Sequence, residues 1–126
     1  MRQGAGMNRR NAMRAMAAVL VARPAAAAPT GWRLMAVTAR DCHESAAFLA
    51  EAAPRHAATP EGRAAPLLLQ PLDAPWPDGL AIGRAPRVTP SFLLLRDGVE
   101  LARFEGYRGW DDHRRRLGRA LAEAGA

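Results

Sequence analysis

The segment from Val88 to Tyr107 constrains the fold of this chain more than any other part of the sequence. Pro90 leads an apolar run, Asp97-Gly98 follows that run, and a second run returns and ends at Gly106. Asp-Gly is a strong signal for a two-residue hairpin turn, because both turn positions favour residues that tolerate positive φ angles. The segment therefore predicts two antiparallel strands, the first of them buried.

The residues ahead of this hairpin predict a strand, a helix and a second strand. Trp32–Thr38 is apolar with a β-branched end and predicts a buried strand. Arg40–Ser45 predicts a turn into a helix that ends near Pro54. Leu67–Leu72 predicts a second buried strand, parallel to the first. One apolar stripe runs along the expected helix: Phe48, Leu49, Ala52 and Ala53.

Two loops and a last helix complete the expected organisation. Thr59–Gly62 predicts a loop, and Pro75–Ala85 predicts a Pro/Gly-rich connection with little helix. The last helix begins at Trp110, and acids occupy its first turn, where the helix dipole favours negative charge. Its apolar face has four residues: Leu117, Ala120, Leu121 and Ala124.

Three further features have packing interpretations. We interpret His113 as a packing residue on the side of the last helix that faces the sheet. Arg114–Arg116 is interpreted as a solvated helix face. Trp76 lies in the Pro-rich connection and either covers the core or contacts a partner.

The chain is long enough for one domain with a modest core, and its basic charge is concentrated at one end. The 126 residues carry a net charge of +6. Five arginines precede residue 28, where the chain has no acid: Arg2, Arg9, Arg10, Arg14 and Arg23. The remainder is close to neutral, at about +1, so the charge gives no case for a nucleic-acid surface.

The first 27 residues are typical of an export signal. A basic start is followed by the short apolar run Ala15–Ala22 and by Ala25–Ala28, which offers an A-x-A cleavage site. Cleavage after Ala27 would leave a domain of residues 28–126. The run is far shorter than the ~20 residues that cross a bilayer, so we expect no permanent anchor and a periplasmic location. Arg9-Arg10 leaves Sec and twin-arginine export both open, and Met7 is an alternative start.

The sequence has a single cysteine, Cys42, at the turn into the first helix. One cysteine excludes an intramolecular disulfide and argues against a cysteine-based zinc site. An unpaired thiol is unusual in an exported protein, because that compartment is oxidising. Any chemistry of this thiol therefore involves a second molecule.

From about Leu34 to Leu121 the chain resembles the exported thioredoxin-like proteins of bacterial sulfur-oxidation operons. Four segments carry the resemblance: Glu61–Pro66, Thr89–Phe92, Asp97-Gly98 and Arg103–Tyr107. The resemblance implies an α/β thioredoxin-like fold, a four-stranded mixed sheet with helices on both faces. Periodicity alone indicates only a small α/β domain.

The resemblance also assigns a site. Such proteins carry Cys-x-x-Cys at a helix N-terminus, and the matching segment here is Cys42-His43-Glu44-Ser45. It implies Cys42 as the attacking sulfur and Ser45 at the position of the second thiol. The neighbouring His43 would tune the thiolate when protonated. Pro90 would be a cis-proline that, with Thr89, shapes the groove for a client. A hydroxyl cannot complete a disulfide, so only monothiol chemistry remains.

Opposing effects leave the direction of the Cys42 pKa open in the sequence. A helix N-terminus stabilises a thiolate and lowers the pKa below the free value of ~8.5. The carboxylates of Asp41 and Glu44 flank the cysteine and act in the opposite direction.

Three functional hypotheses remain. The first is monothiol exchange with a client thiol or disulfide, with glutathione as a further candidate partner and no cofactor. The second is a redox-silent module that holds a client in the groove. The third is a homodimer linked through Cys42. A serine hydrolase using Ser45 and His56, or a copper or zinc site that includes Cys42 and His43, has no supporting spacing.

Overall fold

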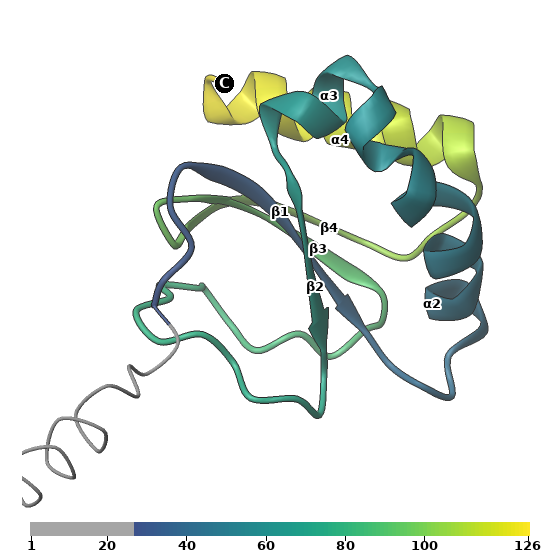
Figure 1. The fold of residues 1–126 in the computed structure, drawn as a ribbon, viewed down its shortest axis with the longest axis horizontal. Helices are drawn as coiled ribbons and strands as arrows, with labels where there is room; N and C mark the ends of the chain where they lie inside the picture. Colours follow the sequence, from purple (N-terminus) through teal and green to yellow (C-terminus); the bar gives the residue numbers. More distant parts are fainter. Residues whose placement is uncertain (1–26) are drawn as a thin grey trace, which may run out of the picture.

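The computed structural model describes residues 27–126, so all but the last residue of the predicted signal peptide lies outside the described residues. Four strands form one sheet in the order β2-β1-β3-β4. β1 (Trp32–Thr38) pairs with β2 (Leu67–Pro71) in parallel and with β3 (Ser91–Arg96) antiparallel, and β4 (Val99–Glu105) pairs antiparallel with β3. The expected four-stranded mixed sheet is confirmed (Figure 1).

The β3–β4 hairpin turns where the sequence predicts it. Asp97 and Gly98 have φ angles of 50° and 81°, the positive values that an Asp-Gly turn requires. The Asp97 carboxylate accepts the backbone N–H of Gly31 at 2.7 Å, and Asp97 N–H donates to the Gly31 carbonyl at 2.9 Å. These two bonds tie the turn to the residue that precedes β1.

The first helical segment extends beyond its predicted end. α2 (His43–Ala47) continues into the π-helical turn η1 (Phe48–Ala52) and the 3-10 turn η2 (Ala53–Ala58). Pro54 therefore does not end the segment. It lies in the first turn of η2, where the missing N–H of proline leaves no hydrogen bond unmade.

The predicted loop Thr59–Gly62 is wrong, because the chain forms the short helix α3 (Pro60–Ala64) there. The Thr59 hydroxyl caps this helix by accepting the N–H of Gly62 at 3.0 Å. Pro60 follows at the first helical position, which its restricted φ angle suits. A Thr-Pro pair can begin a helix as well as a turn. Here the capping bond from Gly62 to Thr59 favours the helix.

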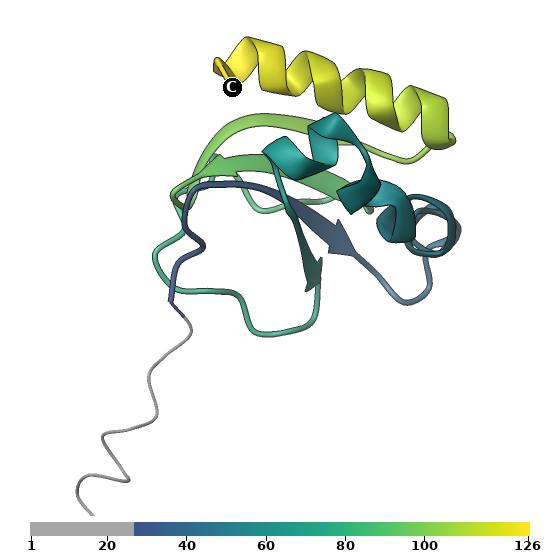
Figure 2. The ribbon, with the colours of Figure 1, turned by 45° about the horizontal axis from the view of Figure 1, so that its top comes forward.

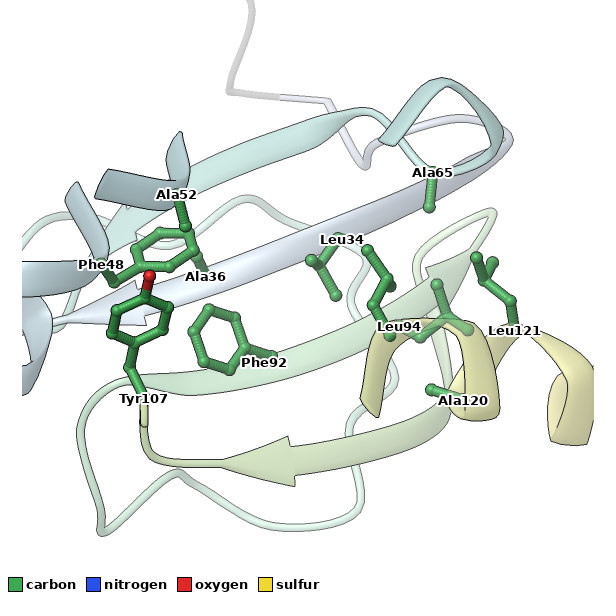
Figure 3. Packing of buried hydrophobic residues seen from close by; sticks show 11 residues of the cluster. Leu34, Ala36, Phe48, Ala52, Ala65, Phe92, Leu94, Tyr107, Ala120 and Leu121 are labelled. Carbon is green, nitrogen blue, oxygen red and sulfur yellow. The ribbon is translucent and has the colours of Figure 1, made fainter. Parts of the chain in front are cut away.

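Within residues 27–126 the helices lie on one face of the sheet, as Figure 2 shows for α3 and α4 (Trp110–Ala124). Alternate residues of β1 and β3 point toward these helices and form the main core, in which Phe48 packs edge-on against Phe92 at 4.8 Å between ring centroids. The core residues labelled in Figure 3 come from the sheet, from the helical segments and from the connections between them: Leu34, Ala36, Phe48, Ala52, Ala65, Phe92, Leu94, Tyr107, Ala120 and Leu121.

The opposite face of the sheet carries a second core that no helix within residues 27–126 covers. Four fully buried side chains point there: Met35, Val37, Leu93 and Leu95. Trp76, Leu80 and Ile82 from the connection between β2 and β3 pack over them. The expectation of helices on both faces is therefore wrong, because this Pro/Gly-rich connection covers the face as irregular chain. Trp76 covers the core.

The predicted apolar face of the last helix is confirmed, but the prediction that Arg114–Arg116 form a solvated face is not. Leu117, Ala120 and Leu121 are buried against the sheet. Arg114 pairs with Glu61 of α3 at 3.0 Å. Arg116 donates to the backbone carbonyl of Gly106 at 3.0 Å and lies over the Phe104 ring. Of the three consecutive arginines, only Arg115 is largely exposed.

A thiol at a helix N-terminus facing a cis-proline

The candidate site forms where β1 ends and α2 begins. Cys42 is the N-cap residue of α2, with extended backbone angles, and its side chain is half-buried. The Sγ atom accepts the backbone N–H of Ser45 at 3.4 Å, as an N-cap oxygen would. The thiol therefore lies at the positive end of the helical turn.

Four donors around the sulfur lower the pKa of Cys42 below its usual value. The hydroxyls of Ser45 and Thr89 contribute most. Burial of the thiol opposes them, and the backbone N–H groups of Ser45 and Glu44 add smaller lowering effects. The Thr89 carbonyl oxygen, 3.1 Å from Sγ, accepts from the neutral thiol and so opposes ionisation. The balance of these contacts lowers the pKa of Cys42, a direction that the sequence alone left open.

The neighbouring Glu44 carboxylate binds elsewhere instead of facing the sulfur. Its Oε1 atom accepts the backbone N–H of Tyr107 at 2.8 Å. Gly106, just before, has a φ angle of +82°, and a Cβ there would lie 3.1 Å from the same carboxylate oxygen. This bond between α2 and the segment after β4 was missed from the sequence, since the two residues lie 63 positions apart.

Thr89 lies against the thiol, and Pro90 follows it in the chain. The Thr89–Pro90 peptide bond is cis, and Pro90 is buried. The Pro90 carbonyl accepts the N–H of Gly106 at 2.8 Å, which ties the start of β3 to the end of β4. The segment that precedes β3 thus meets the N-terminus of α2, with Cys42 and Thr89 in hydrogen-bond contact across 47 positions of sequence.

Ser45 lies where a second thiol would be expected. Its side chain is fully buried, and its Oγ atom accepts the backbone N–H of Ala39 at 3.2 Å. The hydroxyl is thus held between the end of β1 and the sulfur. A bond to His56, as a hydrolase would need, does not form, because His56 Nε2 lies 2.7 Å from the Ala65 carbonyl oxygen.

The structure brings together Cys42, Ser45, Thr89 and Pro90, but not His43. The His43 side chain is exposed and forms no hydrogen bond or ion pair within residues 27–126. Its predicted influence on the thiolate would therefore act through charge in solvent. In the same range, no three His, Cys, Asp or Glu side chains are grouped as metal ligands, and no helix has the length and apolar character of a membrane span.

A solved structure shares this arrangement of elements. The crystal structure of the periplasmic thioredoxin SoxS from Paracoccus pantotrophus, in its reduced form, matches with a TM-score of 0.70 and 38% sequence identity. The match covers 74% of this chain and 98% of that one. The chain belongs to the thioredoxin family. No protein-family model matches the sequence, and no curated protein does either.

Membership of the thioredoxin family makes Ser45 the most informative residue of the site. The family's fold places a helix N-terminus beside the proline-led strand, and this member has one sulfur there, followed three residues later by a hydroxyl. With one cysteine, the site cannot form a disulfide within the chain.

Proposed function

We propose that this thioredoxin-family protein is exported to the periplasm and carries out monothiol thiol–disulfide exchange through Cys42. The observation that supports this most directly is the environment of Sγ. The sulfur caps a helix, accepts the N–H of Ser45 and has a lowered pKa. The thiolate is the reactive form of cysteine, so these contacts favour a nucleophile at neutral pH.

The proposed exchange proceeds in two balanced steps. The Cys42 thiolate attacks one sulfur of a client disulfide or of oxidised glutathione. A mixed disulfide forms, and the other sulfur leaves as a thiolate that takes up a proton from water. In the second step an external thiolate, such as that of reduced glutathione, attacks the mixed disulfide and releases the Cys42 thiolate. The external thiol supplies the second sulfur that Ser45 cannot.

Thr89 and Pro90 are proposed to shape the groove for the client. The Thr89 carbonyl is held 3.1 Å from Sγ, so the backbone of an extended client segment placed there would lie next to the sulfur. When Cys42 ionises, the thiol no longer donates to this carbonyl, which becomes available to a backbone N–H of the client. The Ser45 hydroxyl stabilises the thiolate.

The proposed location rests on the N-terminal residues and on the similar protein. The first 27 residues have the pattern of an export signal, and the similar SoxS thioredoxin is periplasmic. N-terminal sequencing of the protein recovered from a periplasmic extract tests the location and the cleavage of the signal. A mature terminus at Ala28 is expected, and full-length protein confined to the cytoplasm would contradict the proposal.

Trapping of the mixed disulfide tests the chemistry. The protein is incubated with oxidised glutathione at neutral pH and measured by intact-mass spectrometry. We expect one glutathione per chain, no addition to the Cys42→Ala variant, and complete release by excess reduced glutathione. Absence of an adduct after prolonged incubation with glutathione disulfide and with small aromatic disulfides would rule out the exchange.

A redox-silent binding module is the second candidate, and one observation favours it. Val88, directly before Thr89 and Pro90, is 46% exposed, so apolar surface beside the proposed groove is available without a second thiol. In this alternative, Cys42→Ala retains full biological activity. Loss of activity in that variant would exclude the silent module. Non-reducing electrophoresis of the same samples shows whether Cys42 instead links two copies.

A further inference from the structure

Two residues in the first turn of α2 bond across the proposed groove, and only one of them is the cysteine. Cys42 Sγ donates to the Thr89 carbonyl at 3.1 Å. Two positions after the cysteine, Oε1 of Glu44 accepts the backbone N–H of Tyr107 at 2.8 Å. The remaining residues of the turn form no hydrogen bond to those opposing segments within residues 27–126. The thiol-bearing turn is therefore held across the groove at two points.

The opposing segments are fixed to one another without a contribution from α2. The Pro90 carbonyl accepts the N–H of Gly106 at 2.8 Å. The carbonyl of Gly106 in turn accepts from Arg116 of α4 at 3.0 Å. The start of β3, the end of β4 and the last helix are thus joined. The position of the thiol-bearing turn relative to them depends on its own two bonds.

The segment after β4 is shaped around the Glu44 carboxylate. Gly106 has a φ angle of +82°, and a Cβ there would lie 3.1 Å from Oε1 of Glu44. A larger residue would strain the backbone and press on the carboxylate. Glycine therefore lets the next N–H, that of Tyr107, approach the carboxylate oxygen.

The two bonds across the groove differ in what happens to them during thiol–disulfide exchange. In a mixed disulfide Sγ carries no hydrogen, so Cys42 cannot donate to the Thr89 carbonyl. A disulfide sulfur is also a weak acceptor, so the Thr89 hydroxyl gains little by donating to it. The bond from Tyr107 to Glu44 involves no reacting atom and is kept in every state of the sulfur.

We propose that Glu44 is a positioning residue that holds the thiol-bearing turn in the groove while Cys42 is in the mixed disulfide. This inference deepens the exchange proposed above and rests on it. With Glu44 present, the turn keeps one bond across the groove, and the sulfur–sulfur bond stays beside Thr89. Without Glu44, formation of the mixed disulfide leaves the turn with neither of its two bonds.

Amide hydrogen exchange of Ala46, measured by NMR, reports on this turn. The Ala46 N–H donates to the Cys42 carbonyl at 3.0 Å and closes the first turn of α2. The mixed disulfide is prepared with methyl methanethiosulfonate: the Cys42 thiolate attacks the divalent sulfur, a sulfur–sulfur bond forms, and methanesulfinate leaves. This reagent modifies accessible thiols whether or not a client disulfide reacts, so the result is independent of the glutathione experiment. Free and blocked protein are compared at a pH below the midpoint of Cys42 alkylation, where both sulfurs are uncharged.

Three variants separate the bond from the charge. Glu44→Ala removes the acceptor of the Tyr107 N–H, whereas Glu44→Gln removes the charge and keeps an oxygen in reach of it. Asp41→Ala is the matched control, because this exposed carboxylate also lies next to Cys42 but forms no hydrogen bond or ion pair within the described part of the chain.

Blocking Cys42 alone, or Glu44→Ala alone, should accelerate exchange at Ala46 by about threefold or less, because one bond across the groove remains. Both changes together should exceed the product of the single effects by about fivefold or more, since groups that share one task are not additive. Glu44→Gln should restore most of the protection in the blocked protein, and Asp41→Ala should show no such excess.

Two results would overturn the proposal. If blocking and Glu44→Ala simply multiply, the Glu44 bond does not replace the one that the sulfur loses. If Glu44→Gln matches Glu44→Ala, Glu44 acts on the helix through its charge and not through the bond to Tyr107.

Discussion

The backbone N–H of Ser45 points at the Sγ atom of Cys42 across 3.4 Å, within the first turn of α2. The side chain of the same serine is buried beside the sulfur and contributes most to the lowered pKa of Cys42. One residue thus both replaces the second thiol of the family's motif and stabilises the thiolate of the first. Its substitution separates these two effects.

Removing the Ser45 hydroxyl should raise the pKa of Cys42. In Ser45→Ala the backbone N–H stays while the hydroxyl, the largest of the lowering contributions, is lost. The pH dependence of Cys42 alkylation measures this, with free glutathione as the reference at a pKa of about 8.5–9. The midpoint of the wild-type protein should lie below that of glutathione, and the midpoint of the variant should lie above that of the wild type.

Two further variants complete this comparison. Ala46→Ser adds a hydroxyl one residue later, at an exposed position of α2, and should leave the midpoint unchanged. His43→Gln tests the predicted tuning by His43, which would raise the midpoint. A midpoint that Ser45→Ala does not move would show that the helix N-terminus alone controls the thiol.

Restoring a second thiol should convert the site to dithiol chemistry. Ser45→Cys places a sulfur one helical turn from Cys42, where the Ser45 hydroxyl already contacts the sulfur. After mild oxidation, intact-mass spectrometry should show the loss of two hydrogens, reversible with dithiothreitol. Ala46→Cys, on the exposed side of the helix, should form intermolecular disulfides instead. A Ser45→Cys variant that keeps two free thiols would mean that the site geometry does not permit closure.

His113 should make the stability depend on pH between about 6.5 and 4. It is 2% exposed, surrounded by aromatic rings, and both of its ring nitrogens lack hydrogen-bond partners within residues 27–126. Burial, then His56 and Arg116, lower its pKa from 6.5 to about 4, against a weaker opposing effect of Asp112. As the pH falls, His113 takes up a proton in the unfolded chain at a higher pH than in the folded one. The contribution of neutral His113 to the free energy of unfolding is therefore complete above pH 6.5 and is lost as the pH drops to about 4.

Protonation of His113 in the unfolded chain should lower the free energy of unfolding by about 3 kcal/mol at pH 4. Urea denaturation at several pH values measures it as the difference between the wild-type protein and His113→Phe, which cannot take up a proton. His43→Gln is the control, since that side chain is exposed. The prediction would be contradicted if the free energy of unfolding changed with pH equally in the wild-type protein and in His113→Phe.

Gly62 and Gly118 should respond to alanine in opposite directions. A Cβ on Gly62 would lie 1.6 Å from the His56 carbonyl oxygen, a backbone atom that also accepts the Thr59 hydroxyl. Gly62→Ala must therefore shift η2 against α3, with an expected loss of about 3 kcal/mol. Gly118, within α4, has nothing within 4 Å of its Cβ position, and Gly118→Ala should stabilise by about 0.5–1 kcal/mol. Thermal unfolding of both variants measures the difference.

Local patterns were sufficient for much of the fold. The β1 strand and the Asp97-Gly98 turn lie where the sequence predicts them, because a buried apolar run and an Asp-Gly pair act through neighbouring residues. The short helix α3 was missed because its start depends on a single capping bond, from the Gly62 N–H to the Thr59 hydroxyl. The sheet face that no helix of residues 27–126 covers was missed because no local pattern says on which side of a sheet a connection packs.

The sequence by itself determined which chemistry is available: one sulfur at the start of a helix, a hydroxyl three residues later, and a proline ahead of a buried strand. Only the tertiary structure decided the state of that sulfur. Cys42 contacts Thr89, which lies 47 positions away in the sequence. The Glu44 carboxylate accepts the N–H of Tyr107, 63 positions away. Electrostatic effects on a thiol act over a few ångströms, so they depend on which distant residues the packed sheet brings within that range.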